Sequence, residues 1–200
     1  LKSIESNAFC GCQSLVKITI PSSVTRIEQE SFFNCSNLSE ISFESPSSLE
    51  SIGYSAFYAC ISLVKISIPS SVTEIGEKSF FRCNKLTEVS FENQSSLKSI
   101  ENSTFSGCSS LLKISIPSSV TRIEQESFFN CSNLSEISFE SQSSLESIEY
   151  GAFNNCSSLV KFSIPSSVTE IGERSFLRCN NLAEISFESP SSLKSIGINA

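Results

Sequence analysis

The nine cysteines are the side chains in this sequence best suited to chemistry. A thiol can act as a nucleophile, bind a soft metal ion or form half of a disulfide. Eight of the nine recur at intervals that alternate between 23 and 25 residues, at Cys12, Cys35, Cys60, Cys83, Cys108, Cys131, Cys156 and Cys179. This even spacing places the thiols in a line, unlike the C-x-x-C pairs that converge on a zinc ion.

The line of thiols has two interpretations. Free cysteine is among the most often buried residues and packs like a small hydrophobe, which predicts a ladder of structural thiols. Neighbouring thiols could instead approach disulfide distance, although the alternating intervals work against a common register. The ninth cysteine, Cys10, falls outside the line and is either a reactive thiol or a neutral substitution.

The groups that usually activate a catalytic thiol or hydroxyl are missing. The sequence has no His, and each of its 21 acidic residues is Glu. This removes Cys-His and Ser-His-Asp nucleophile arrangements and Asp-based calcium loops. The net charge of −7 disfavours a nucleic-acid partner, and no apolar run reaches membrane-spanning length. We therefore expect no catalytic residue, no metal, no cofactor, no nucleic acid and no membrane insertion by this segment.

Each cysteine of the line belongs to a repeated unit. A Phe precedes it by three residues, a Leu follows it by three, and apolar residues then alternate, as in Ile18 and Ile20. Eight complete units and the start of a ninth at Leu193 fill residues 1–200, which we expect to form one repeat domain. Neither end carries a polar cap, so we expect an excerpt of a longer protein.

The unit predicts its own secondary structure. Segments such as 17–20 and 40–43 alternate apolar and polar residues with period two, which indicates short strands. Segments such as 25–28 are expected to form second, shorter strands, and 28–35 to form a single helical or 3-10 turn. One unit cannot bury its apolar face alone, so the units should stack into a solenoid with a parallel sheet, rising ~4.8 Å per coil.

Two rows of side chains are expected to face outward from the longer strands, one residue of each row per coil. The first row alternates in sign: Lys17, Glu40, Lys65, Glu88, Lys113, Glu136, Lys161 and Glu184. The second row carries hydroxyls: Thr19, Ser42, Ser67, Ser90, Ser115, Ser138, Ser163 and Ser186. Adjacent Lys and Glu can neutralise each other, so the rows are either solvated surface or a flat protein-binding face.

Two further rows repeat every second coil. Glu44, Glu92, Glu140 and Glu188 open the longer turns and make one rim acidic, which serves solubility or docking. Val16, Val64, Leu112 and Val160 alternate with smaller residues. If these four side chains are exposed they suit a protein partner, and if they are covered by the preceding turn they belong to the core.

The segment IPSSVTEIGEKSFFRCNKL, from Ile68 to Leu86, resembles the BspA-like, or treponemal-type, leucine-rich repeat. The resemblance extends over essentially all 200 residues. It implies a right-handed, strand-rich leucine-rich-repeat solenoid with a parallel concave sheet. It also implies a large cell-surface or secreted protein that adheres to host proteins or other cells, with a host or extracellular-matrix protein as the expected ligand.

Two functions follow. The first is a non-catalytic adhesion and protein-binding solenoid at the cell surface or in secretion, which the resemblance favours. The second is an intracellular, cytoplasmic scaffold of the same fold, which cysteines without disulfides favour, because oxidising compartments tend to pair them.

Overall fold

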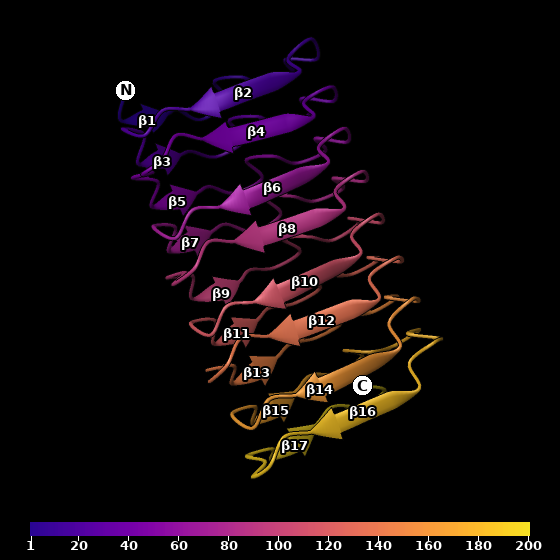
Figure 1. The fold of residues 1–200 in the computed structure, drawn as a ribbon. Coiled ribbons are helices and arrows are strands. Elements are labelled where there is room, and N and C mark those ends of the chain that lie inside the picture. Colours follow the sequence, from indigo (N-terminus) through magenta and orange to yellow (C-terminus); the bar gives the residue numbers. More distant parts are fainter.

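The computed structural model describes residues 1–200 as a solenoid of 17 strands joined by turns, without helices (Figure 1). Eight strands have four residues: β2 (Lys17–Ile20), β4 (Glu40–Phe43), β6 (Lys65–Ile68), β8 (Glu88–Phe91), β10 (Lys113–Ile116), β12 (Glu136–Phe139), β14 (Lys161–Ile164) and β16 (Glu184–Phe187). Nine have two residues: β1 (Ser3–Ile4), β3 (Arg26–Ile27), β5 (Ser51–Ile52), β7 (Glu74–Ile75), β9 (Ser99–Ile100), β11 (Arg122–Ile123), β13 (Ser147–Ile148), β15 (Glu170–Ile171) and β17 (Ser195–Ile196).

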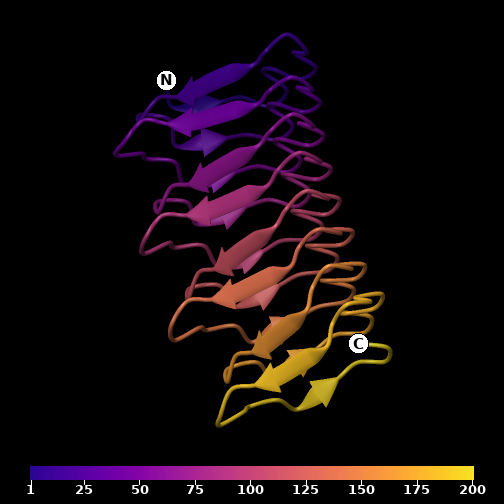
Figure 2. The ribbon, with the colours of Figure 1, turned by 45° about the vertical axis from the view of Figure 1, so that its right-hand side comes forward.

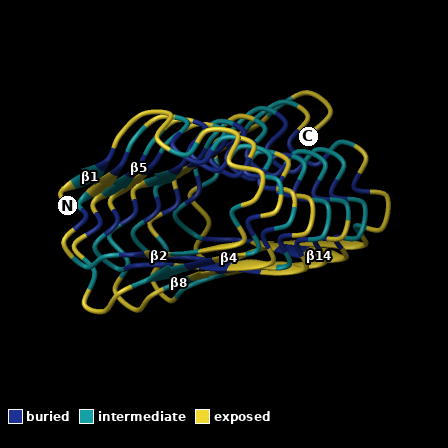
Figure 3. Cartoon of the chain, turned by 90° about the horizontal axis from the view of Figure 1, so that it is seen from above, coloured by how far each residue is buried: buried dark blue, intermediate teal, exposed yellow.

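The four-residue and two-residue strands stack on two different sides of the solenoid, as the turned views show (Figures 2 and 3). All strand pairs are parallel. The hydrogen-bonded ladder of long strands runs from β2 to β12 and resumes with β14 and β16, and the ladder of short strands is interrupted between β7 and β9. The predicted parallel-strand solenoid with short second strands is confirmed.

The register of the long strands alternates along the stack. Where 23 residues separate two strands, as for β6 and β8, all four residues pair, from Lys65 with Glu88 to Ile68 with Phe91. Where 25 residues separate them, as for β4 and β6, only Glu40 with Lys65 pairs. The longer turn therefore lets the strands on either side of it diverge after their first residue.

The interior is built from ladders of identical side chains. Seven successive pairs of phenylalanines, from Phe9 to Phe176, stack at 5.1–5.5 Å between ring centroids and within 17° of parallel. The Leu ladder beside it is fully buried from Leu38 to Leu159. Because each coil repeats these residues, every ring and every Leu covers its equivalent in the neighbouring coil, which is how a solenoid buries its apolar surface.

The prediction of a helical or 3-10 turn in each coil is wrong, and the hydrogen bonds explain why another structure forms. Local bonds three residues apart, such as Phe33 N–H to Glu30 O, alternate with bonds to the next coil, such as Phe32 N–H to Ala56 O. Two residues per coil, for example Glu30 and Asn34, have φ near +55°. A 3-10 helix needs consecutive local bonds and negative φ, so these segments form a ladder of turns, which we call the turn ladder.

Candidate functional site: the long-strand face

The outer side of the eight long strands is an uncovered sheet surface, which we call the long-strand face. It consists of the first and third residue of each strand, the alternating Lys/Glu row and the hydroxyl row. No element packs over it in the view along the stack (Figure 3). All eight Lys and Glu side chains are exposed, whereas the second residue of every long strand from β4 to β14 is buried. From β4 to β14, strand alternation thus presents mainly short hydroxyls and charged groups to solvent.

Most Lys side chains of this face form no direct ion pair with a neighbouring Glu. The register places Lys and Glu side by side in the ladders, yet only Lys17 and Glu40 form an ion pair, with 2.7 Å between Nζ and Oε1. No other Lys of the row lies within 4.0 Å of a carboxylate oxygen. The expected chain of mutual pairs is therefore formed at one position, and Lys65, Lys113 and Lys161 keep their donors available.

The replacement Lys113→Glu would place three carboxylates in a row, because Lys113 pairs in register with Glu88 on one side and Glu136 on the other. We expect the melting temperature at low ionic strength to fall by about 2 °C, since exposed charge pairs contribute little each. The difference should shrink in about 0.5 M salt, which screens the repulsion. Lys98→Glu, outside the face, is the control, and an equal loss there would contradict the explanation.

Shallow hollows interrupt the face at the junctions where the strands diverge. Three of them, of about 340, 290 and 270 Å³, lie between β4 and β6, β8 and β10, and β12 and β14. Each is lined by one Lys, at least one Glu, two or three Ser and two or three apolar residues. Because the turn lengths alternate from coil to coil, the hollows recur at every second coil along the face.

The acidic residues of the longer turns have a structural contact. In each case the carboxylate accepts a hydrogen bond from the backbone N–H of a Ser in the short turn of the preceding coil, at 3.0–3.2 Å: Glu44 with Ser22, Glu92 with Ser70, Glu140 with Ser118, and Glu188 with Ser166. The row therefore joins successive turns in addition to making the rim acidic.

Replacing Glu92 with Ala should lower the free energy of unfolding by about 1 kcal/mol, because the Ser70 N–H loses a charged acceptor. Glu92→Gln keeps an acceptor oxygen and should cost less. Urea denaturation measures both, with the exposed Glu74→Ala as control. A loss for Glu74→Ala as large as for Glu92→Ala would show that this turn contact adds nothing.

The four apolar residues that precede the Lys-bearing strands are exposed. Val16, Val64, Leu112 and Val160 are 55%, 43%, 51% and 50% accessible. The equivalent residues of the coils between them are Ser39, Thr87, Ser135 and Ala183. The margin of the long-strand face therefore alternates large apolar and small side chains with the same two-coil repeat as the charges and hollows.

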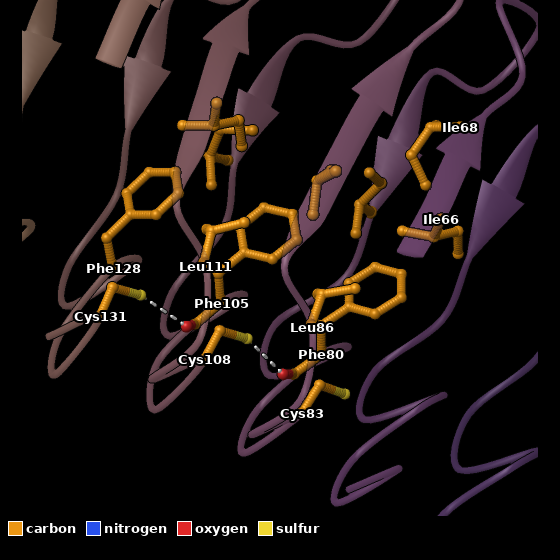
Figure 4. Close-up of a cluster of buried hydrophobic side chains, with 14 of the residues drawn as sticks. Ile66, Ile68, Phe80, Cys83, Leu86, Phe105, Cys108, Leu111, Phe128 and Cys131 are labelled. Carbon is orange, nitrogen blue, oxygen red and sulfur yellow. Dashed lines mark hydrogen bonds between the residues drawn. The ribbon is translucent and has the colours of Figure 1, made fainter. Parts of the chain in front are cut away.

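The cysteines lie on another side of the interior, next to the Phe ladder (Figure 4). Seven are buried, from Cys35 to Cys179, whereas Cys12, in the first coil, and Cys10 are exposed. Each buried thiol donates to the backbone carbonyl of the Phe in the preceding coil, at 3.0–3.3 Å; examples are Cys108 with Phe80 and Cys131 with Phe105. All nine cysteines are free.

Burial makes these thiols poor nucleophiles. Desolvation of the thiolate raises the pKa of Cys108 to about 12 and that of Cys35 and Cys179 to about 11, from an ordinary value of 9.0. It holds the pKa of the other four buried thiols well above 9.0. The nucleophile is the thiolate, so chemistry would be confined to Cys10 and Cys12.

The arrangement defines a class of protein, a parallel-strand repeat solenoid with one uncovered sheet face. The chain belongs to the BspA type leucine rich repeat family, whose model matches residues 2–120 and 98–200. No curated protein matches the chain. No helix in the structure has the length and apolar character needed to cross a bilayer.

Solved structures with the same fold come from several bacteria. The chain is 24% identical to the pneumococcal vaccine antigen PcpA, with a TM-score of 0.72, covering 97% of this chain but 57% of that chain. It is 26% identical to the leucine-rich repeat protein of T. pallidum, with a TM-score of 0.60 and 91% and 72% of the two chains covered. A leucine-rich repeat protein of Bacteroides ovatus gives 26% identity, a TM-score of 0.53, and 98% and 78% coverage.

Proposed function

We propose that this repeat domain is a non-catalytic protein-binding and adhesion module of a surface or secreted protein, and that it binds its ligand on the long-strand face. One observation carries the proposal: the face is uncovered, and three of its four Lys ammonium groups are not engaged by neighbouring carboxylates. Charged and hydroxyl groups at regular spacing fit a protein surface or an extended peptide, since complementary charge gives specificity and speeds association.

The repeat family supports the location, because the BspA-type resemblance implies surface and secreted proteins that adhere to host proteins or other cells. The interior gives no competing site. Its thiols are buried and donate to backbone carbonyls, and they are therefore engaged in packing.

Binding of the purified domain to immobilised collagen, laminin and fibronectin, and to intact cells, tests the proposal. A face variant carries Lys17→Glu, Lys65→Glu, Lys113→Glu and Lys161→Glu. An off-face variant carries Lys2→Glu, Lys78→Glu, Lys98→Glu and Lys194→Glu, with the same net charge. We expect the parent domain to bind. The face variant should bind with at least tenfold lower affinity, and the off-face variant should keep the affinity of the parent. Binding that both variants retain equally would contradict the choice of face.

A second candidate is an intracellular scaffold of the same fold. The nine free cysteines favour it, because oxidising compartments tend to pair cysteines in disulfides. Labelling the surface of intact cells with a membrane-impermeant biotin reagent separates the two candidates. A surface protein is labelled before lysis, whereas an intracellular scaffold is labelled only afterwards.

A further inference from the structure

We propose that the long-strand face binds a second copy of this chain, in an antiparallel, face-to-face dimer. The proposal rests on the proposed function, because it assigns a partner to the same face. The partner is identified by two patterns that the face carries: the order of its charges, and the order of large and small side chains along its margin.

The row of alternating Lys and Glu is complementary in charge to a second copy of itself in which the order of coils is reversed. Its eight exposed members alternate Lys and Glu from Lys17 to Glu184, one per coil. A two-fold axis parallel to the strands keeps each residue's position along the strand and reverses the order of coils. With the axis between β8 and β10, Lys17 faces Glu184 of the second copy, Lys65 faces Glu136, and Lys113 faces Glu88. Every Lys then meets a Glu, and any axis midway between two coils preserves this opposition of sign.

Under the same axis, the side chains along the margin of one copy are complementary in size to those of the other copy. Its large residues are exposed, and reversing the order of coils places each of them opposite a small one. The resulting pairs are Val16 with Ala183, Val64 with Ser135, Leu112 with Thr87, and Val160 with Ser39. The axis that matches charges therefore also lets apolar side chains fill the places left by small ones, as a self-complementary interface requires.

The face is free to make these contacts. Lys65, Lys113 and Lys161 form no ion pair within the chain, so their ammonium groups are available to the carboxylates of a second copy. Between the charges the face carries only Thr and Ser side chains, so two copies can approach closely. The hollows on the face meet one another across the axis and leave room for bridging water.

The contact is small, which sets the expected strength. Eight strands spaced ~4.8 Å apart, with about five residues along each strand, give a contact area of about 600 Å² per copy. The total of about 1,200 Å² lies at the lower limit of specific interfaces, so the dimer should be reversible at micromolar concentrations. The net charge of −7 on each copy also opposes association, so the local match must outweigh a general repulsion.

Sedimentation equilibrium with charge-exchanged variants tests the proposal. The face variant, with four Lys→Glu replacements, makes the row wholly acidic. A reciprocal variant, with Glu40→Lys, Glu88→Lys, Glu136→Lys and Glu184→Lys, makes it wholly basic. We expect the parent chain to dimerise, each variant alone to bind itself at least tenfold more weakly, and their mixture to form a one-to-one dimer.

The off-face variant distinguishes pairing between complementary faces from a general attraction between oppositely charged proteins. It has the same net charge as the face variant but keeps the alternating row, so mixing it with the reciprocal variant should give no comparable dimer. If the four-fold variants misfold by circular dichroism, Lys113→Glu and Glu88→Lys give the same test, because these residues face each other across the axis.

A parent chain that stays monomeric at about 1 mM, or variants that dimerise as well as the parent, would overturn the dimer. Retained, face-dependent binding to the matrix proteins or cells would then show that only this inference fails. A dimer together with no binding to either would instead contradict adhesion to those ligands and leave the dimer in place.

Discussion

Raising the pH from about 7 to about 10 is expected to destabilise this domain, because its buried thiols resist ionisation. Burial raises the pKa of Cys108 to about 12 from an ordinary 9.0, and the other six buried thiols shift in the same direction. Above pH 9 the unfolded chain releases thiol protons that the folded chain retains. Stability is therefore intact below pH 9 and falls as pH rises toward the folded pKa values.

Cys108 should contribute roughly 1 kcal/mol of lost stability per pH unit above pH 9, and the other buried thiols should add losses of the same sign. Urea denaturation between about pH 8 and pH 10.5 measures the slope. Cys108→Ala should make the slope shallower, because the one proton that this thiol releases only on unfolding no longer contributes. Equal slopes for the parent and Cys108→Ala would contradict this account of alkaline unfolding.

The second large effect is expected from Phe105→Ala, which should lower the free energy of unfolding by about 3–5 kcal/mol. The Phe105 ring is fully buried and stacks on Phe80 and Phe128, each at 5.5 Å between centroids. Its removal leaves a cavity between two rings and interrupts the ladder in the middle of the stack. Urea denaturation at neutral pH measures the loss, from both the midpoint and the slope of the transition.

Phe129→Ala is the matched control, because Phe129 is one coil further on and only half-buried. It should cost much less than Phe105→Ala, since less apolar area leaves water when this ring packs. A change in the slope of the urea transition for Phe105→Ala would indicate that the coils on either side unfold separately, as a nearest-neighbour stack allows. Similar losses for the two variants would contradict the assignment of Phe105 to the main ladder.

The sequence predicted the parts of the fold that a single coil determines. Period-two alternation located strands at 17–20 and 40–43, and the spacing of Phe, Cys and Leu indicated repeated interior positions. Each of these features depends on residues close in sequence, so one unit repeated eight times carries the signal strongly.

Features that depend on how one coil sits on the next were not predictable in this way. The turn ladder replaces the expected helical turn because Phe32 N–H bonds to the following coil. Lys113 lies in register with Glu136 yet makes no ion pair, and the longer turns open hollows by ending the register early. The sequence showed a Glu at the start of every longer turn. It did not show that this Glu accepts a hydrogen bond from the preceding coil, as Glu92 does from Ser70, because that contact forms only when the turns are stacked.

The repeated cysteines help to build the interior, and we propose that function resides on the long-strand face instead. Thiol labelling of the native domain at neutral pH, followed by mass spectrometry of its peptides, tests the interior role of these cysteines most directly. We predict that Cys10 and Cys12 react quickly, and that the seven buried thiols react only as fast as the domain unfolds. Native-state labelling of Cys108 or Cys131 at the rate of Cys10 would contradict that role.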